Sequence, residues 1–152
     1  MNNRRKFIIN STLGTLGLSL FSKSLFTKEN LKHLTILHTN DMHSHIHPFK
    51  SGSNKGLGGM AQRAHLINKI RKENTNILLL DSGDIFQGTP YFNMYGGELE
   101  LKLMSKMNYD ACTIGNHDLY NGLNGLKNQL KHANFPFLIA NYDFSDTILK
   151  DT

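Results

Sequence analysis

Residues 34–45 read LTILHTNDMHSH, a short apolar run followed at once by polar residues that can bind a metal ion. Residues 77–84, ILLLDSGD, and residues 111–118, ACTIGNHD, repeat this plan. A fourth apolar run, FLIA, lies at residues 137–140. Short apolar runs bounded by turn residues are typical of buried strands. The sequence therefore predicts four buried strands.

Between these runs, apolar residues recur at the three- and four-residue spacing of a helix face. The predicted faces are Met60, Ala64, Ile67 and Ile70, then Leu99, Leu103 and Met107, then Leu123, Leu126 and Leu130. Strands that alternate with helices favour an α/β fold with a mostly parallel sheet built from β-α-β units.

Polar residues follow each of the first three runs. Asp41 and His43 come after the first run, Asp84 after the second, and Asn116 and His117 after the third. Because the carboxyl ends of parallel strands meet at one edge of the sheet, we expect these side chains to lie close together. Asp, Asn and His bind divalent cations without a thiolate. The pattern predicts a two-metal site in which Asp84 is the bridging carboxylate.

Two further histidines extend this pattern. His45 and His47 follow His43 at a spacing of two, so on an extended segment all three would face the same side. They form either a histidine-rich metal cluster or part of a solvated loop. The loop is favoured, because only Asp41 and His43 have the D-x-H spacing.

Charge is distributed unevenly along the 152 residues. The chain has 17 Lys and Arg against 12 Asp and Glu, but five of the bases and none of the acids lie in the first 28 residues. The remainder is neutral, which argues against a general basic surface and against a nucleic-acid polymer as partner. Cys112 is the one cysteine, so neither an internal disulfide nor a cysteine-pair metal site is available.

The first 28 residues have the order of an export signal. Arg4 and Arg5 precede an apolar stretch from Ile8 to Phe26, as in twin-arginine signals. This stretch is too short and too rich in Ser and Gly to span a bilayer. We expect an exported protein, periplasmic or on the cell surface, that meets the membrane only through this signal. The alternative is a basic N-terminus without a targeting role.

Four longer strings carry a family resemblance. They are ILHTNDMHS at 36–44, GDIFQGTP at 83–90, GELELKLM at 97–104 and YDACTIGNHD at 109–118. Together they resemble the calcineurin-like metallophosphoesterases, in particular the bacterial 5′-nucleotidase and UDP-sugar hydrolase branch. The resemblance implies that residues 29–152 are the N-terminal half of an α/β/β/α sandwich, an incomplete domain of a truncated chain.

The resemblance also implies a function: an exported 5′-nucleotidase that hydrolyses nucleotide phosphate esters with a water activated by two divalent ions, of Zn, Mn, Co or Fe. Asp41 and His43 match ligands of one ion, and Asp84 matches the bridging ligand. Asn116 matches the ligand of the second ion that also reaches the phosphate. His117 matches the histidine that stabilises or protonates the reacting group.

The sequence departs from this branch in two ways. Tyr120 stands where the branch has an Asp that orients the catalytic histidine. The later G-H and G-H-x-H motifs do not occur before Thr152, so a missing C-terminal half is an expected partner. Two alternatives remain: a non-catalytic metal- or partner-binding remnant, and an exported sulfur-ester hydrolase of the same superfamily.

Overall fold

The structure is a computed structural model that describes residues 32–150. The predicted export signal at residues 1–28 lies outside the described residues. Residues 1–33 and 34–152 are separate units, and the fold below is that of the second. Within residues 32–150, no helix combines the length and the apolar character needed to cross a membrane.

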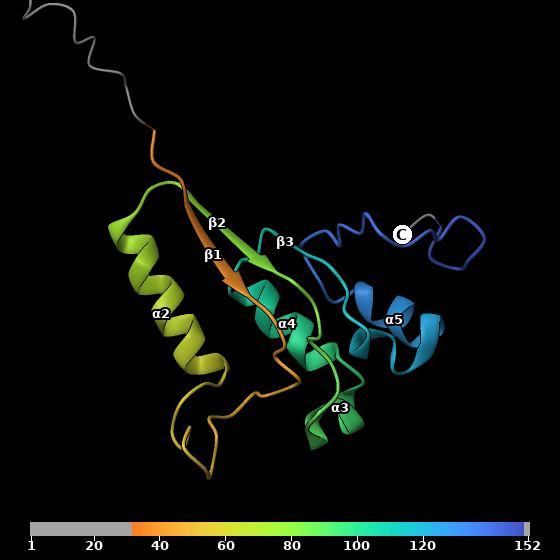
Figure 1. Ribbon diagram of the computed structural model, residues 1–152, viewed down its shortest axis with the longest axis horizontal. Helices are drawn as coiled ribbons and strands as arrows, with labels where there is room; N and C mark the ends of the chain where they lie inside the picture. Colours follow the sequence, from red (N-terminus) through yellow and green to blue (C-terminus); the bar gives the residue numbers. More distant parts are fainter. Residues whose placement is uncertain (1–31, 151–152) are drawn as a thin grey trace, which may run out of the picture. The chain divides into compact units, whose positions relative to one another are not determined.

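Three of the four predicted runs form a sheet. Strands β1 (Thr35–Thr39), β2 (Ile77–Asp81) and β3 (Ala111–Cys112) are parallel and lie in the order β1-β2-β3 (Figure 1). Thr39 of β1 pairs with Asp81 of β2, and Asp81 pairs with Cys112 of β3. The predicted parallel α/β arrangement is confirmed, and the three strands end at the same edge.

The fourth predicted strand is reduced to a single bridge. Phe137 pairs in parallel with Cys112, whose N–H donates to the Pro136 carbonyl at 3.1 Å and whose carbonyl accepts from Leu138 N–H at 2.8 Å. Because β3 is only two residues long, it offers no further partners to residues 137–140. Residues 137–140 do lie beside β3, but they pair with it at one residue only and do not form a strand.

In the described part of the chain, four α-helices and one 3₁₀ helix connect and flank the strands. They are α2 (Met60–Glu73), α3 (Pro90–Tyr95), α4 (Glu98–Lys106), η1 (His117–Leu119) and α5 (Gly122–Leu130). The helices expected from periodicity are α2, α4 and α5. Helix α3 was not predicted, although it has a recognisable start: Thr89 accepts a hydrogen bond from Tyr91 N–H and Pro90 occupies the first turn.

The core lies on one face of the sheet. Leu79 of β2 and Cys112 of β3 point to this face, and both are almost fully buried. Ile67 of α2, Leu101 of α4 and Leu126 of α5 belong to the same buried cluster. The three longer helices therefore cover one side of the sheet and hold its carboxyl edge in place.

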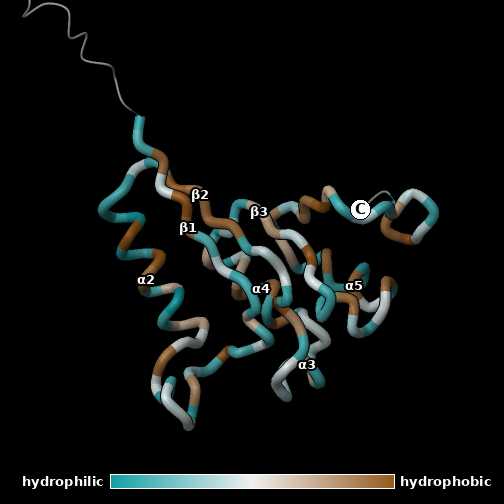
Figure 2. Tube along the Cα trace, viewed as in Figure 1, coloured by the Kyte–Doolittle hydropathy of each residue, from teal (hydrophilic) through white to brown (hydrophobic). Residues whose placement is uncertain are grey.

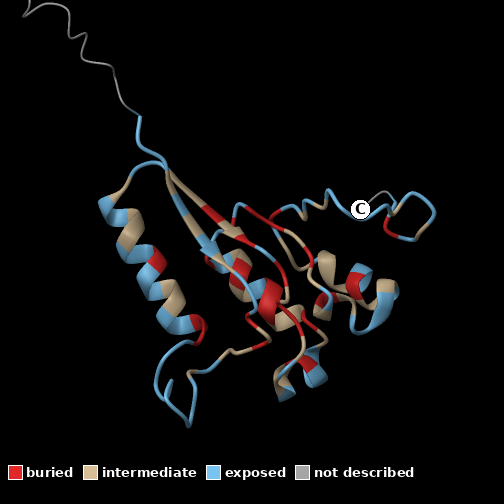
Figure 3. Ribbon diagram, viewed as in Figure 1, coloured by how far each residue is buried: buried red, intermediate tan, exposed pale blue. Residues whose placement is uncertain are grey.

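The other face of the sheet is only partly covered in the described part of the chain. Ile36 of β1 is 58% exposed, and Leu138 beside β3 is 62% exposed. Figure 3 shows β1 alternating between intermediate and exposed residues, while Figure 2 shows hydrophobic residues along β2. The prediction of a buried strand is therefore wrong for β1, because α2, α4 and α5 pack on one side only.

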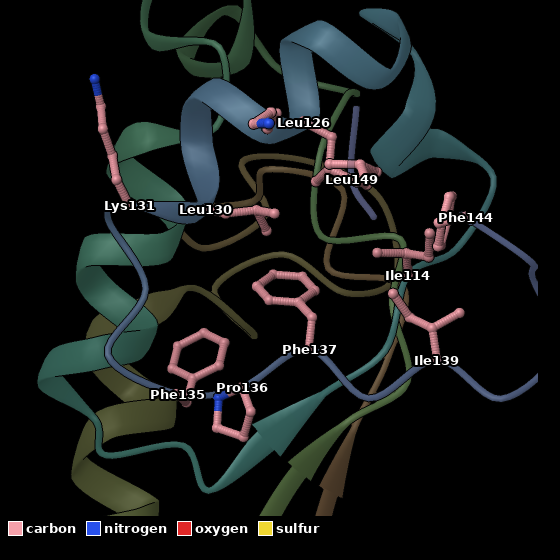
Figure 4. A pocket seen from close by; sticks show the side chains of 11 residues that line it. Ile114, Leu126, Leu130, Lys131, Phe135, Pro136, Phe137, Ile139, Phe144 and Leu149 are labelled. Carbon is pink, nitrogen blue, oxygen red and sulfur yellow. The ribbon is translucent and has the colours of Figure 1, made fainter. Parts of the chain in front are cut away.

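An apolar pocket of about 510 Å³ lies between α5 and residues 135–139. The rings of Phe135 and Phe137 stack in it with centroids 5.8 Å apart. Figure 4 shows both rings facing Leu130 of α5. Most of the side chains that line the pocket are apolar, and Lys127 and Lys131 also line it. None of these residues belongs to the metal centre described next.

Candidate metal centre

The predicted ligands gather beyond the carboxyl ends of the three strands. His43, Asp84 and His117 each offer a ligand atom, and these three atoms all lie within 4.8 Å of one another. His43 Nε2 is 3.9 Å from Asp84 Oδ2 and 3.7 Å from Asp41 Oδ1. Four of the five predicted site residues are thus joined through His43.

Backbone hydrogen bonds hold the three turns together. Asp41 N–H donates to the Gly83 carbonyl at 3.0 Å, and His43 N–H donates to the Asp84 carbonyl at 3.0 Å. His117 N–H donates to Asp84 Oδ1 at 2.9 Å. One oxygen of Asp84 is therefore engaged by the third turn, while Oδ2 faces His43.

The ligand-bearing turns have an unusual backbone. The φ angles are 50° at Asp41, 46° at His43, 56° at Ser44 and 56° at Asp84. This left-handed region costs a non-glycine residue roughly 1–2 kcal/mol. Such residues cluster at functional sites, where the surrounding structure holds them in place. Here the hydrogen bonds between the turns supply that restraint.

Two glycines allow the second and third turns to approach. A Cβ on Gly83 would lie 2.3 Å from the nitrogen of Gly115, and a Cβ on Gly115 would lie 2.1 Å from Asp84 Oδ1. Neither position can accept a side chain without moving the backbone. The glycines of the G-D and G-N-H motifs are therefore required by the contact between these turns.

Asp118 is a buried residue that links the second and third turns of the site through hydrogen bonds. It is 3% exposed, and its carboxylate accepts hydrogen bonds from the N–H groups of Asp84, Ile85, Phe86 and Gly115 at 2.8 to 3.0 Å. Burial raises its pKa above the ordinary value of an Asp, and these hydrogen bonds oppose the shift. The sequence analysis assigned Asp118 no role. The one local signal was an acid three residues after Gly115, a spacing that allows a side chain to accept from the turn.

Asp81 supports the same turns at the end of β2. Its carboxylate accepts from the Thr39 hydroxyl and from Gly83 N–H at 2.9 Å. Burial raises the pKa of Asp81, and burial also raises the pKa of the neighbouring Cys112 thiol. Cys112 therefore stays a protonated core residue and is no thiolate ligand.

Asn116 and His117 occupy different environments. Asn116 is exposed, and its carbonyl accepts from Leu119 N–H at 3.3 Å. The His117 ring lies edge-on to the His43 ring, with centroids 4.8 Å apart. His117, predicted as a catalytic group, therefore also lies within the ligand cluster, which motif matching did not anticipate.

Tyr120 does not replace the aspartate of the family motif. It is 65% exposed, and its ring meets the edge of Phe92 at a centroid distance of 6.1 Å. Within residues 32–150, no hydrogen bond joins its hydroxyl to His117. The orientation of the His117 ring depends instead on its backbone bond to Asp84 and on the neighbouring His43 ring.

His45 and His47 turn away from the cluster. The His45 ring is hydrogen-bonded to the His43 carbonyl at 3.0 Å and packs on Phe49, while His47 packs on Tyr91. The left-handed turn at His43 and Ser44 breaks the extended conformation that would have aligned the histidines. Neither belongs to the ligand cluster of the described residues.

The donor set fits a divalent cation. The ligand atoms of two imidazoles and a carboxylate lie within 4.8 Å of one another, and Asp41 lies beside them. These donors suit Zn, Mn, Co or Fe and lack the thiolates that soft ions prefer. The hydrogen bonds between the turns hold these donors in this arrangement. The cluster therefore offers donors of the type that a divalent-metal site needs, and the two-metal arrangement stays a prediction.

Comparison with known proteins agrees with this geometry. The profile of the calcineurin-like phosphoesterase family matches residues 34–150. The chain belongs to the calcineurin-like phosphoesterase family. The matched range includes every residue of the cluster and all three strands that carry it.

Relatives within the family are 5′-nucleotidases. Snake venom 5′-nucleotidase of Crotalus adamanteus is 46% identical over 71% of this chain and 19% of its own length. The human 5′-nucleotidase is 43% identical over 71% of this chain and 20% of its own. The chain thus spans about a fifth of the length of these curated relatives.

Solved structures share the fold. The NAD nucleotidase of Haemophilus influenzae superposes with a TM-score of 0.71 at 33% identity, covering 78% of this chain and 22% of that protein. A 5′-nucleotidase precursor of Thermus thermophilus superposes with a TM-score of 0.69 at 40% identity, covering 74% and 23%. The fold of the described domain is therefore shared with these two nucleotidase structures.

Proposed function

We propose that this chain acts as a metal-dependent phosphoesterase of the 5′-nucleotidase type, on the phosphate ester of nucleotides. The observation that carries this is the ligand cluster of His43, Asp84 and His117 on a family match over residues 34–150. The 5′-nucleotidase relatives favour a nucleotide over the sulfur esters of the alternative interpretation.

In this proposal, Asp41 and His43 hold one ion, Asp84 is shared, and Asn116 serves the second. Divalent ions bound there would activate a water and offset the charge of the phosphate oxygens. The residues supply the rest. Asp84 presents Oδ2 while Oδ1 stays on His117 N–H, and the exposed Asn116 amide can donate to a phosphate oxygen. The His117 imidazole can donate a proton to the same group.

A nucleotide assay tests the proposal. We expect the protein that contains this domain to bind adenosine 5′-monophosphate only with Mn²⁺ or Zn²⁺ present and to release phosphate from it, but to release no sulfate from an aryl sulfate. Asp84→Ala should abolish binding and release. Ligand binding without phosphate release would favour the second candidate, a non-catalytic metal-binding protein, which the exposed position of Tyr120 supports. Absence of metal-dependent binding contradicts both.

We also propose that residues 1–28 direct export to the periplasm or the cell surface. The support is the Arg4-Arg5 pair before an apolar stretch, together with relatives named as a venom enzyme and as a precursor. Fused to a reporter that folds before it crosses the membrane, this segment should cause translocation. Replacing both arginines with Lys should impair it, and unchanged export would contradict a twin-arginine signal.

A further inference from the structure

A buried polar group lies directly behind the His43 turn and has no role in the site as described so far. Ser44 and Glu100 are both 0% exposed. The Ser44 hydroxyl donates to Glu100 Oε1, and it lies 2.8 Å from the Thr89 hydroxyl. These residues come from three of the sequence motifs, at 36–44, 83–90 and 97–104, whose glutamate and threonine had no assignment.

The direction of these hydrogen bonds identifies Glu100 as the final acceptor. Ser44 has one hydroxyl proton, and it goes to Glu100. A proton shared between the two hydroxyls must therefore come from Thr89, which can also donate to the Ser44 carbonyl at 2.9 Å. The Ser44 hydroxyl is thus oriented by Glu100, and the Thr89 hydroxyl is oriented by Ser44.

Ser44 is also hydrogen-bonded through its backbone, within the turn that carries the ligand His43. Ser44 N–H donates to the Ile85 carbonyl at 2.9 Å, and the Ser44 φ of 56° continues the left-handed turn of His43. On the other side, Glu100 lies in α4, which Leu101 and Met104 anchor in the core with 0% exposure. The chain of contacts therefore connects a rigid helix to the residue beside a ligand.

A glutamate is a costly choice for this position if it only fills space. A buried carboxylate is expensive unless hydrogen bonds satisfy it, and Glu100 Oε2 has no partner among the described residues. An apolar side chain of similar size would fill the core at lower cost. The hydrogen bond to Ser44 is what such a replacement would lose.

We propose that Glu100 is a positioning residue for the metal centre: through Ser44 it holds the His43 turn so that Nε2 faces Asp84. This inference rests on the proposed function. Outer hydrogen bonds that orient metal ligands typically contribute about 10- to 100-fold in metal affinity. Glu100 does not contact His43 directly in this role, but acts through Ser44 on the backbone of the turn.

Titration of the full chain with Co²⁺, followed by its visible absorption, tests this role. Glu100→Leu removes the acceptor and should weaken Co²⁺ binding at least about tenfold and change the band shape. Glu100→Gln keeps an amide oxygen for Ser44 and should restore both. The matched control is Glu98→Leu, because Glu98 lies on the same helix, is paired with Lys102 and is partly exposed. It should bind as the unmodified chain does.

Ser44→Ala provides a second variant if Glu100→Leu fails to fold by circular dichroism. It deletes only the hydroxyl and should weaken Co²⁺ binding in the same way. If the folded variants bind Co²⁺ with the affinity and spectrum of the unmodified chain, this inference is wrong, while the proposed function is unaffected. If the unmodified chain gives no cobalt bands, the proposed metal centre fails and this inference fails with it.

Discussion

At the scale of single residues, the metal centre depends on carboxylates that do not face it. Asp81, Glu100 and Asp118 are all buried, and each accepts hydrogen bonds from a turn that carries a ligand or from its neighbour. Buried acids are costly, so their presence beneath one small cluster indicates that they serve the geometry of the turns. The ligands themselves are more exposed.

Asp81 gives a prediction for pH. Its folded pKa is raised, mainly by burial, so it contributes stability that is present below the ordinary Asp value of about 3.9 and is lost as pH rises through the folded pKa. Asp81→Asn can keep both contacts, because its amide oxygen accepts from Gly83 N–H and its amide nitrogen can donate to the Thr39 hydroxyl.

We therefore expect the free energy of unfolding of the unmodified chain, measured relative to Asp81→Asn, to fall as pH is raised from about 4 towards neutral. Urea denaturation at several pH values measures this difference. Groups common to both proteins cancel in the comparison. A difference that stays constant across this pH range would show that the carboxyl titrates normally.

The ligands could be predicted from sequence because their motifs are local. Asp41, His43 and Asp84 each follow an apolar run within four residues of a strand end. Asp118 and Glu100 could not be predicted, because their roles arise from contacts with residues more than thirty positions away. From the sequence alone, an acidic residue in a helix is expected to lie on the surface, because its buried hydrogen-bond partner is distant in the chain.

At the scale of elements, the helices were predicted more accurately than their faces. For α4 the predicted buried face was Leu99, Leu103 and Met107. Met107 is buried just after the helix and Leu103 packs against the core, but the fully buried residues of the helix are Glu100, Leu101 and Met104. Leucines at 99, 101 and 103 make the helical period ambiguous. The choice between faces was decided by packing against the sheet and α5, which the local sequence does not contain.

Leu101 gives a prediction for α4. Leu101→Ala should reduce the free energy of unfolding by about 2–5 kcal/mol, because the side chain is fully buried and a cavity would remain. The matched control is Leu66→Ala in α2, since Leu66 is 57% exposed and the same atoms are removed. It should cost less than about 1 kcal/mol. Chemical denaturation of both variants measures this, and equal losses would show that α4 does not pack as described.

At the scale of the whole chain, the sheet is covered on one face and the ligands lie at its carboxyl edge. The alternation of strands and helices predicted this edge, because right-handed crossovers return each strand in the same direction. The exposure of Ile36 and Leu138 was not predicted, because an apolar run does not show which face of the strand is covered by other elements. A chain that spans about a fifth of its relatives' length thus carries three turns that bear candidate ligands.

The central claim is that Asp84 completes a divalent-cation site with Asp41 and His43. Calorimetric titration of Mn²⁺ into the purified 152-residue chain tests it most directly. We expect saturable binding, weakened at least about tenfold by Asp84→Ala and unchanged by Asp146→Ala, which removes an exposed carboxylate elsewhere. Equal binding by the unmodified chain and by folded Asp84→Ala, or no binding by the unmodified chain, would contradict the account.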